Sequence, residues 1–257
     1  MSEPAAHRLH HPGPLVAGTT VRLDAESSHH ALRVLRLAPG DAIEVFDGGG
    51  LRCPGTLLDA DARGASVALG APREAGTESP LALGLAQGLP AGDKMDWVIE
   101  KAVELGVSVV QPLFARRSLT RLEGDRAVRR LAHWRRIAVA ACMQCGRDRI
   151  PEIAEPLPLA RWLAGPGADA LPGRAPGAPG PARWMLSPRG TGALATLPAP
   201  AGGAWLLAGP ESGLSEDEEA RALAAGWTPL RLGPRTLRTE TAGLAAIAAL
   251  QARFGDF

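Results

Sequence analysis

Two loops near the carboxyl end of this 257-residue chain constrain its fold more than any other feature. Residues 209–215 follow the apolar run 204–208, and residues 233–238 follow the run 229–232. Both loops are rich in glycine and proline and lead into helical segments, the first of which opens with the capping-box pair Ser215 and Glu218. Loops of this kind lie at the carboxyl ends of strands in open α/β sheets, where ligands bind. The pattern therefore predicts a small-ligand site here.

Strand and helix patterns alternate from residue 81 onward. Apolar runs at 81–87, 107–113 and 183–187 have the length of buried strands, and 126–146 and 239–254 are expected to be helices. This alternation is typical of an α/β fold with a parallel sheet flanked by helices.

The first part of the chain shows a different pattern of apolar and turn residues. Short β segments separated by glycine-rich turns occupy residues 20–70, which predicts a small β-barrel-like domain. Residues 73–80 are polar and end in a proline, so they are expected to form a linker. The predicted domains are therefore 1–72 and 81–257.

Two glycines of the first loop, Gly209 and Gly213, leave room for a ligand to approach the backbone, and Pro210 and Pro234 stiffen both loops. The alternative, that these are only tight turns, stays open. The chain has neither a G-x-G-x-x-G motif after its early strands nor a P-loop, so a nucleotide-like cofactor would have to be held in another way.

Positive charge is concentrated in one segment. Residues 116–149 contain ten arginines and three acidic residues, although the whole chain has a net charge of only +1. Unpaired charges are costly inside a protein, so this segment predicts a phosphate-facing surface, with a merely solvated helix face as the alternative. Nine of the ten are the candidates for this surface, namely Arg116, Arg117, Arg121, Arg129, Arg130, Arg135, Arg136, Arg147 and Arg149.

Cysteine use and the N-terminus indicate an intracellular protein. The three cysteines are too few and uneven for a disulfide framework, and Cys142-x-x-Cys145 lacks the second cysteine pair of a zinc site, so no metal is expected. No secretory leader and no apolar run of about 18 residues is present, so we expect a cytoplasmic protein without a membrane segment.

The two loops resemble, nearly letter for letter, the cofactor site of the RsmE-type 16S ribosomal RNA uridine-N3 methyltransferases, members of the SPOUT superfamily. The resemblance runs nearly end to end. It includes residues 8–15, an N-terminal arm; residues 30–36 and 46–48, part of a PUA-like domain; and residues 94–95, 101–107, 141–147 and 187–189. It implies a C-terminal SPOUT domain, which is a trefoil-knotted parallel sheet with flanking helices, and a small N-terminal PUA-like β-barrel domain that binds RNA.

The resemblance also implies a function. The family transfers a methyl group from S-adenosyl-L-methionine to N3 of one uridine in the 16S rRNA of the 30S subunit, and its members are homodimers. Carried over residue by residue, the cofactor site would consist of Leu186, Gly209, Pro210, Glu211, Gly213, Leu232, Gly233, Thr236, Leu237 and Arg238.

We expect Arg238 and Arg8, the latter from either subunit, to stabilise the uracil anion that develops in the reaction. Glu240 is a candidate proton acceptor, although a carboxylate beside a helix N-terminus can also be purely structural. The RNA contacts are expected at Arg33, Arg36, Arg117, Arg147 and Arg149.

Three residues depart from the family pattern. Ser212 replaces a glycine, Met143 replaces a glutamate, and His10 replaces an aromatic residue of the arm. Met143 removes any carboxylate role at its position, which keeps an inactive RNA-binding assembly factor open as an alternative. A SPOUT methyltransferase that acts on a ribose 2′-hydroxyl or on tRNA is the other alternative.

Overall fold

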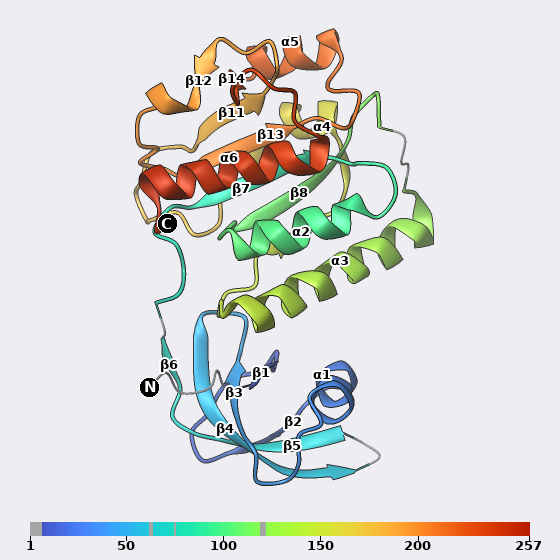
Figure 1. Ribbon diagram of the computed structural model, residues 1–257, viewed down its shortest axis with the longest axis vertical. Helices are drawn as coiled ribbons and strands as arrows, with labels where there is room; N and C mark the ends of the chain where they lie inside the picture. The colour runs from blue at the N-terminus through green and yellow to red at the C-terminus, as the bar shows by residue number, and fades with distance from the viewer. Residues whose placement is uncertain (1–6, 62–63, 75, 119–121) are drawn as a thin grey trace. The chain divides into compact units, whose positions relative to one another are not determined.

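The computed structural model describes residues 7–61, 64–74, 76–118 and 122–257. The chain divides into two compact units (Figure 1). The first unit contains the chain up to Glu78 together with Val139–Ile150, and the second contains Ser79–Ala138 and Pro151–Phe257. The first unit thus includes Val139–Ile150, a segment that lies well beyond the expected linker 73–80 in the sequence.

The first unit is built on a six-stranded sheet in which β1 runs parallel to β3 and the other pairs are antiparallel. Alternate side chains such as Leu9, Val45 and Val67 form its core. The strands are β1 (His7–His10), β2 (Thr20–Arg22), β3 (Ala42–Phe46), β4 (Leu51–Asp61), β5 (Gly64–Leu69) and β6 (Arg73–Glu74). The small β domain expected from the sequence is confirmed.

One short helical segment interrupts these strands. Helix α1 (Ala25–His29) begins where the Asp24 carboxylate accepts the Ser27 N–H at 2.7 Å, as an N-cap does. It continues directly into the π-helical turn η1 (His30–Val34). The turn is followed by Arg36, which has a φ of 56°, the left-handed region that residues other than glycine rarely adopt.

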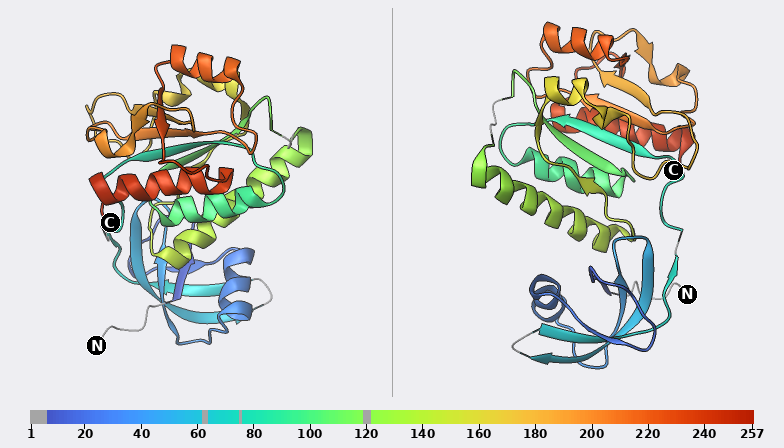
Figure 2. Two further views of the ribbon diagram at one scale, coloured as in Figure 1. Left: turned by 45° about the horizontal axis from the view of Figure 1, so that its top comes forward. Right: turned by 180° about the vertical axis from the view of Figure 1, so that it is seen from behind.

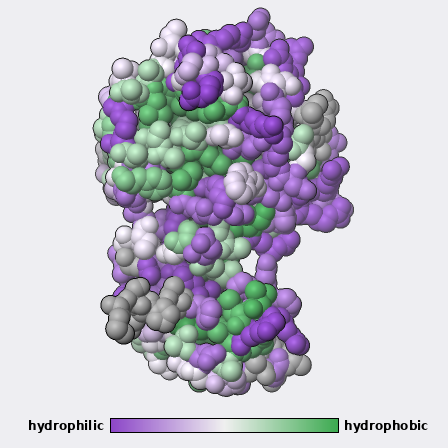
Figure 3. Space-filling model, viewed as in Figure 1, coloured by the Kyte–Doolittle hydropathy of each residue, from purple (hydrophilic) through white to green (hydrophobic). Residues whose placement is uncertain are grey.

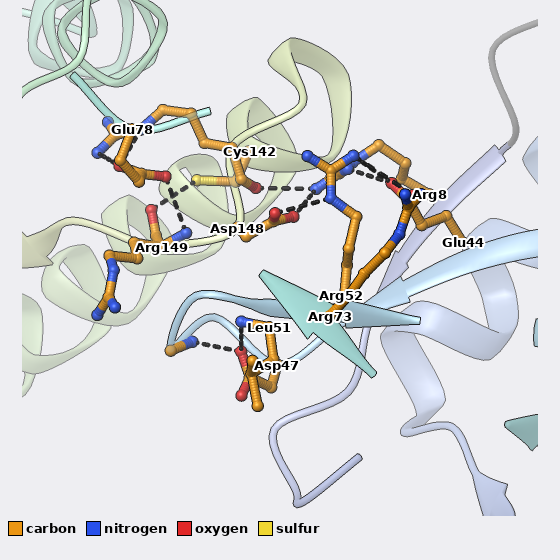
Figure 4. A network of polar contacts seen from close by, with 12 residues as sticks. Arg8, Glu44, Asp47, Leu51, Arg52, Arg73, Glu78, Cys142, Asp148 and Arg149 are labelled. Carbon is orange, nitrogen blue, oxygen red and sulfur yellow. Dashed lines mark hydrogen bonds and ion pairs between the residues drawn. The ribbon is translucent and has the colours of Figure 1, made fainter. Parts of the chain in front are cut away.

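A buried charge network ties the segment 139–150 to the strands of the first unit (Figure 4). The Asp148 side chain is 2% exposed, and its two oxygens accept hydrogen bonds from Arg8 and Arg52, both at 2.8 Å. Glu44 pairs with the same two guanidinium groups. Two carboxylates thereby balance two arginines, which offsets the cost of burying Asp148 and of leaving the other three side chains only 10–16% exposed.

Arg73, Glu74 and Glu78 of the expected linker 73–80 make specific contacts with other parts of the first unit. Strand β6 pairs with β4, and Glu78 accepts hydrogen bonds from the Arg147 guanidinium at 2.7 Å and from the Arg149 N–H at 3.1 Å. The polar residues that looked like a solvated linker therefore have partners that lie far away in the sequence.

The second unit contains an eight-stranded sheet in which every pair of strands is parallel. Its path is β10-β8-β7-β13-β11-β14-β12, with β9 beside β8. The strands are β7 (Leu83–Gly88), β8 (Val109–Phe114), β9 (Glu152–Ile153), β10 (Leu157–Pro158), β11 (Ala182–Leu186), β12 (Gly192–Ala193), β13 (Ala204–Ala208) and β14 (Thr228–Arg231). This confirms the expected parallel α/β fold.

Helices cover both faces of this sheet, so its central strands β7 and β13 are buried along their whole length (Figure 2). On one face, Trp205 packs edge-on against Trp162, with ring centroids 5.3 Å apart. On the other, Ile247 and Leu250 are buried. These helices are α2 (Lys94–Glu104), α4 (Leu159–Ala164), α5 (Glu216–Ala224) and α6 (Thr239–Phe254), with short 3₁₀ turns η2 (Pro166–Ala168) and η3 (Leu194–Thr196). Helix α3 (Gly124–Cys145) belongs to the second unit up to Ala138 and to the first unit from Val139 onward. Within the described ranges, none of the helices combines the length and the hydrophobicity that crossing a bilayer requires.

Breaking the buried network should destabilise the first unit. Asp148→Asn removes a charge that faces two buried guanidinium groups, so we expect a loss of about 3–5 kcal/mol in the free energy of unfolding. The matched control is Asp61→Asn, because Asp61 pairs with Arg22 on the surface, where the two side chains are 41% and 37% exposed. That control should lose at most about 1 kcal/mol.

Urea unfolding followed by far-UV circular dichroism measures this difference. All six tryptophans lie in the second unit, so their fluorescence reports that unit separately. Equal losses in the two variants would contradict the stabilising role of the network.

Candidate functional site

A cavity of about 710 Å³ lies at the carboxyl ends of β11, β13 and β14. Its walls are the loops that follow these strands and the first turn of α6, which is where an α/β sheet is expected to bind a ligand. Every residue that the sequence analysis expects to hold the cofactor lines it, namely Leu186, Gly209, Pro210, Glu211, Gly213, Leu232, Gly233, Thr236, Leu237 and Arg238.

The glycines of the first loop are required by the loop itself. A Cβ on Gly209 would lie 3.0 Å from the Leu214 nitrogen, and Gly213 has a φ of 67°. The Gly213 N–H donates to the Pro210 carbonyl at 2.8 Å and closes the turn. The tight turn itself therefore requires both glycines, which the sequence analysis expected to make room for a ligand. The turn also forms one wall of the cavity.

A chain of hydrogen bonds fixes this loop to the start of α6. Gln87, fully buried at the end of β7, donates to the Thr239 hydroxyl at 3.0 Å, and that hydroxyl donates to the Gly209 carbonyl at 2.7 Å. The ends of two neighbouring strands and the first residue of α6 are therefore held in one arrangement.

Three charged side chains meet at one side of the cavity. The Lys94 ammonium lies 3.0 Å from Glu211 Oε1 and 3.5 Å from Glu240 Oε2. Burial alone would raise the pKa of Glu211, but hydrogen bonds from the N–H of Ala91, from its own backbone and from Lys94 outweigh burial and lower it. The hydrogen bond to Glu211 also raises the pKa of Lys94, so both groups are ionised at neutral pH.

Arg238, the expected catalytic cation, is the N-cap residue of α6 and lines the cavity with a side chain that is 82% exposed. Its nearest carboxylate is Glu240, with 4.0 Å between Arg238 Nη1 and Glu240 Oε1. Such a long, exposed contact leaves the guanidinium able to reorient toward a substrate.

Arg117, an expected RNA contact, also lines the cavity. It donates to the Ser212 carbonyl at 3.0 Å. Because Ser212 makes this contact with its backbone, the change from the glycine of the family pattern leaves the contact intact.

Arg8 and Arg147 do not lie at this cavity. Their side chains are only 10% and 8% exposed, and they belong to the first unit, where Arg8 pairs with Glu44 and Asp148, and Arg147 with Glu78 (Figure 4). Their roles in catalysis and in RNA binding stay predictions, and in this structure both guanidinium groups are paired with carboxylates of the first unit. Arg33, Arg36 and Arg149 are exposed, as phosphate contacts require, and Arg121 lies outside the described residues.

Sequence reasoning gave no role to five charged residues that line the cavity, namely Lys94, Arg189, Glu219, Arg231 and Arg235. Lys94 was detectable in principle, because it follows the carboxyl end of the β7 strand and must lie at the same edge of the sheet as the two loops. Cys142 on α3 is not a reactive thiolate at neutral pH, since burial raises its pKa to about 12 and keeps the thiol protonated.

Comparison with known proteins identifies the family. A model described as an RNA methyltransferase domain matches residues 77–251, and a model described as an RNA methyltransferase PUA domain matches residues 23–69. The chain belongs to the RNA methyltransferase family. This methyltransferase is 30% identical over 235 residues to the ribosomal RNA small subunit methyltransferase E of Buchnera aphidicola subsp. Acyrthosiphon pisum, over 91% of the chain and 88% of the relative. It is 33% identical over 253 residues to that of Synechocystis sp., over 96% and 78%.

Solved structures agree with this assignment. A ribosomal RNA small subunit methyltransferase E from Neisseria gonorrhoeae, bound to S-adenosyl methionine, matches this RNA methyltransferase with a TM-score of 0.86 and 35% identity, over 98% of this chain and 99% of that one. A methyltransferase structure from Legionella pneumophila, in complex with the same cofactor, gives a TM-score of 0.90 and 30% identity, over 99% and 100%.

The cavity wall should be sensitive to one added methyl group. A Cβ on Gly88, at the end of β7, would lie 2.7 Å from the Pro210 nitrogen and 3.0 Å from the Gly209 carbonyl carbon. Both are backbone atoms that cannot move aside, so we expect Gly88→Ala to lower the free energy of unfolding by about 1–3 kcal/mol.

The control is Gly180→Ala, where a Cβ would meet nothing within 4 Å and the backbone is not left-handed. The free energy of unfolding of this control should stay within about 0.5 kcal/mol of the wild-type value. Urea unfolding followed by tryptophan fluorescence compares the two, and a neutral Gly88→Ala would show that the two backbones do not approach so closely.

Proposed function

We propose that this protein methylates N3 of a specific uridine in small-subunit ribosomal RNA, with S-adenosyl-L-methionine as the methyl donor. The observation that carries the proposal is the cavity at the carboxyl ends of β11, β13 and β14, lined by every residue expected for the cofactor. Relatives named ribosomal RNA small subunit methyltransferase E support the substrate, and the neighbouring structures bound to S-adenosyl methionine support the donor.

The cavity suits such a cofactor in size and in lining. Its volume of about 710 Å³ falls within the range of about 300–1,000 Å³ that small-molecule sites occupy. Loops 209–214 and 232–238 would hold the donor largely through backbone groups, which explains why no dinucleotide-binding or P-loop motif is needed. When bound, the donor supplies a methyl group already activated as a sulfonium.

The residues of the chain then have to favour the anion of the uracil ring. The N3 proton leaves only about two pH units above neutrality, so removing it costs about 3 kcal/mol at roughly 1.4 kcal/mol per unit. The Arg238 guanidinium lines the cavity and is exposed, so it can approach the ring and stabilise this charge. Holding the base in line with the methyl group supplies much of the remaining acceleration.

Glu240 has two possible roles, proton acceptor or structural carboxylate. Its side chain is 17% exposed and lies between Lys94 and Arg238. This position favours a structural role, because both neighbours are cations at ion-pair distance, which favour the ionised carboxylate.

The PUA domain would bind the RNA around the target base. The matched residues 23–69 include Arg33 and Arg36, both exposed and both on or beside the π-helical turn η1. We propose that this turn presents them to RNA phosphates. Arg117 and Arg149, which lie elsewhere in the chain, are further proposed phosphate contacts. A substrate in the small ribosomal subunit would also place the protein in the cytoplasm.

We also propose that the protein is a homodimer, as the resemblance implies. Apolar side chains gather on the surface over α6 (Figure 3), where Leu244, Ala245 and Ala248 are partly exposed. Light scattering after size-exclusion chromatography measures the mass, and a monomer at micromolar concentration would reject this part of the proposal.

The decisive experiment is methyl transfer to small subunits purified from a strain that lacks this protein. Mass spectrometry of the digested RNA should show one N3-methylated uridine after incubation with S-adenosyl-L-methionine. A methylated ribose, or activity on tRNA alone, would overturn the assignment to uracil N3. Cofactor binding without any methylated product would indicate a binding protein instead of an enzyme.

Arg238→Ala should slow the chemical step. We expect kcat to fall about 100-fold, as when one preorganised charge-stabilising donor is removed from an active site. Cofactor affinity should change little, because the side chain is mostly exposed. Arg238→Lys keeps the charge and should recover part of the rate. Full turnover by Arg238→Ala in a single-turnover assay would exclude this residue from catalysis.

Arg33 and Arg36 should contribute to the salt dependence of RNA binding. Each phosphate contact contributes about one log unit of affinity per log unit of salt, so Arg33→Gln/Arg36→Gln should reduce the slope by about 1.5 to 2. Arg161→Gln, an exposed arginine on α4 outside the expected contacts, is the control and should leave the slope unchanged. Fluorescence anisotropy across salt concentrations gives the slopes, and identical slopes in all three proteins would remove η1 from the RNA interface.

A further inference from the structure

One lysine at the edge of the cavity contacts carboxylates from two different walls. Lys94 is the first residue of α2 and one of only two lysines in the chain. Its ammonium contacts Glu211 in the loop after β13, and Glu240 in the first turn of α6. All three residues line the cavity, so a single side chain joins three separate elements around it.

The two carboxylates need this cation. Glu211 is also held by the Ala91 N–H at 3.0 Å, which fixes its direction toward Lys94. Without the ammonium, two negative groups would face each other across one partly enclosed cavity, where water screens charges less than it does on an open surface. The loop after β13 and the start of α6 would then repel each other.

The contacts continue from Lys94 to the proposed catalytic cation. One oxygen of Glu240 lies 3.5 Å from Lys94 and the other lies 4.0 Å from Arg238. Lys94 thus fixes the carboxylate nearest to Arg238. The ammonium itself cannot accept the N3 proton, since its hydrogen bond to Glu211 keeps it charged.

We propose that Lys94 is a positioning residue of the methyl-transfer site. Through Glu211 it holds the cofactor loop in place, and through Glu240 it holds the start of α6, whose N-cap residue is Arg238. This inference rests on the proposed function for its effect on turnover, but its effect on cofactor binding can be measured independently of any RNA.

The test compares two lysines of the same helix. Lys94→Met removes the ammonium and keeps most of the side-chain volume. Lys101→Met is the matched control, because Lys101 also pairs with two carboxylates, Glu100 and Glu104, both at 2.7 Å, but is absent from the cavity lining. Lys94→Arg keeps the charge at the first position.

We expect Lys94→Met to weaken binding of S-adenosyl-L-methionine about 10-fold in calorimetry and to lower kcat about 10- to 100-fold. Lys101→Met should stay within about twofold of the wild type in both, and Lys94→Arg should recover most of the loss. Thermal unfolding of the two methionine variants should be similar, which separates positioning from a general loss of stability.

A double variant tests the route through Glu240. If Lys94 acts on turnover through that carboxylate, Lys94→Met/Glu240→Gln should lose no more kcat than the more damaging single variant, since coupled residues are not additive. Losses that multiply would overturn this route. Unchanged cofactor affinity in Lys94→Met would overturn the role at the loop.

Failure of the proposed function gives a different result. A wild-type protein that binds S-adenosyl-L-methionine but methylates no ribosomal RNA would reject uridine methylation. The cofactor affinities of Lys94→Met, Lys94→Arg and Lys101→Met would still decide whether Lys94 positions the loop.

Discussion

The hydrogen bond from the Thr239 hydroxyl to the Gly209 carbonyl, supported by Gln87, is the contact on which the cavity depends. Parallel strands place their carboxyl ends at one edge, but they do not by themselves fix the loops that follow. Gln87 does so from the end of β7, and the close approach of Gly88 to Pro210 brings the two backbones together. The loop after β13 and the first turn of α6 therefore form two walls at a set separation.

Much of the cavity could be predicted from the sequence because its walls are local features. A strand, a glycine-rich loop and a capped helix follow one another within a few residues at 204–218, and the parallel sheet then brings two such loops to one edge. The resemblance to the RsmE-type enzymes supplied the cofactor and the reaction, which periodicity alone could not.

The partners of charged residues could not be predicted in the same way. Asp148 lies 140 positions from Arg8, and Glu78 lies 69 positions from Arg147. A count of charges along the sequence treats these arginines as available to RNA, whereas in the fold Arg8 pairs with Asp148 and Arg147 pairs with Glu78. The same long-range pairing assigns residues 139–150 to the first unit, which no local composition indicates.

The arrangement of charge in the cavity fits the two charges that the proposed reaction brings together. The donor carries a positive sulfonium, which an exposed guanidinium such as Arg238 would repel if the cavity held no negative charge. Glu211 and Glu240 place negative charge beside the loop after β13 and the start of α6, and Lys94 offsets part of it, within a lining that also holds five arginines and Glu219. The site can therefore hold a cationic donor on one side and present a cation to the developing uracil anion on the other, provided that the two carboxylates keep their places.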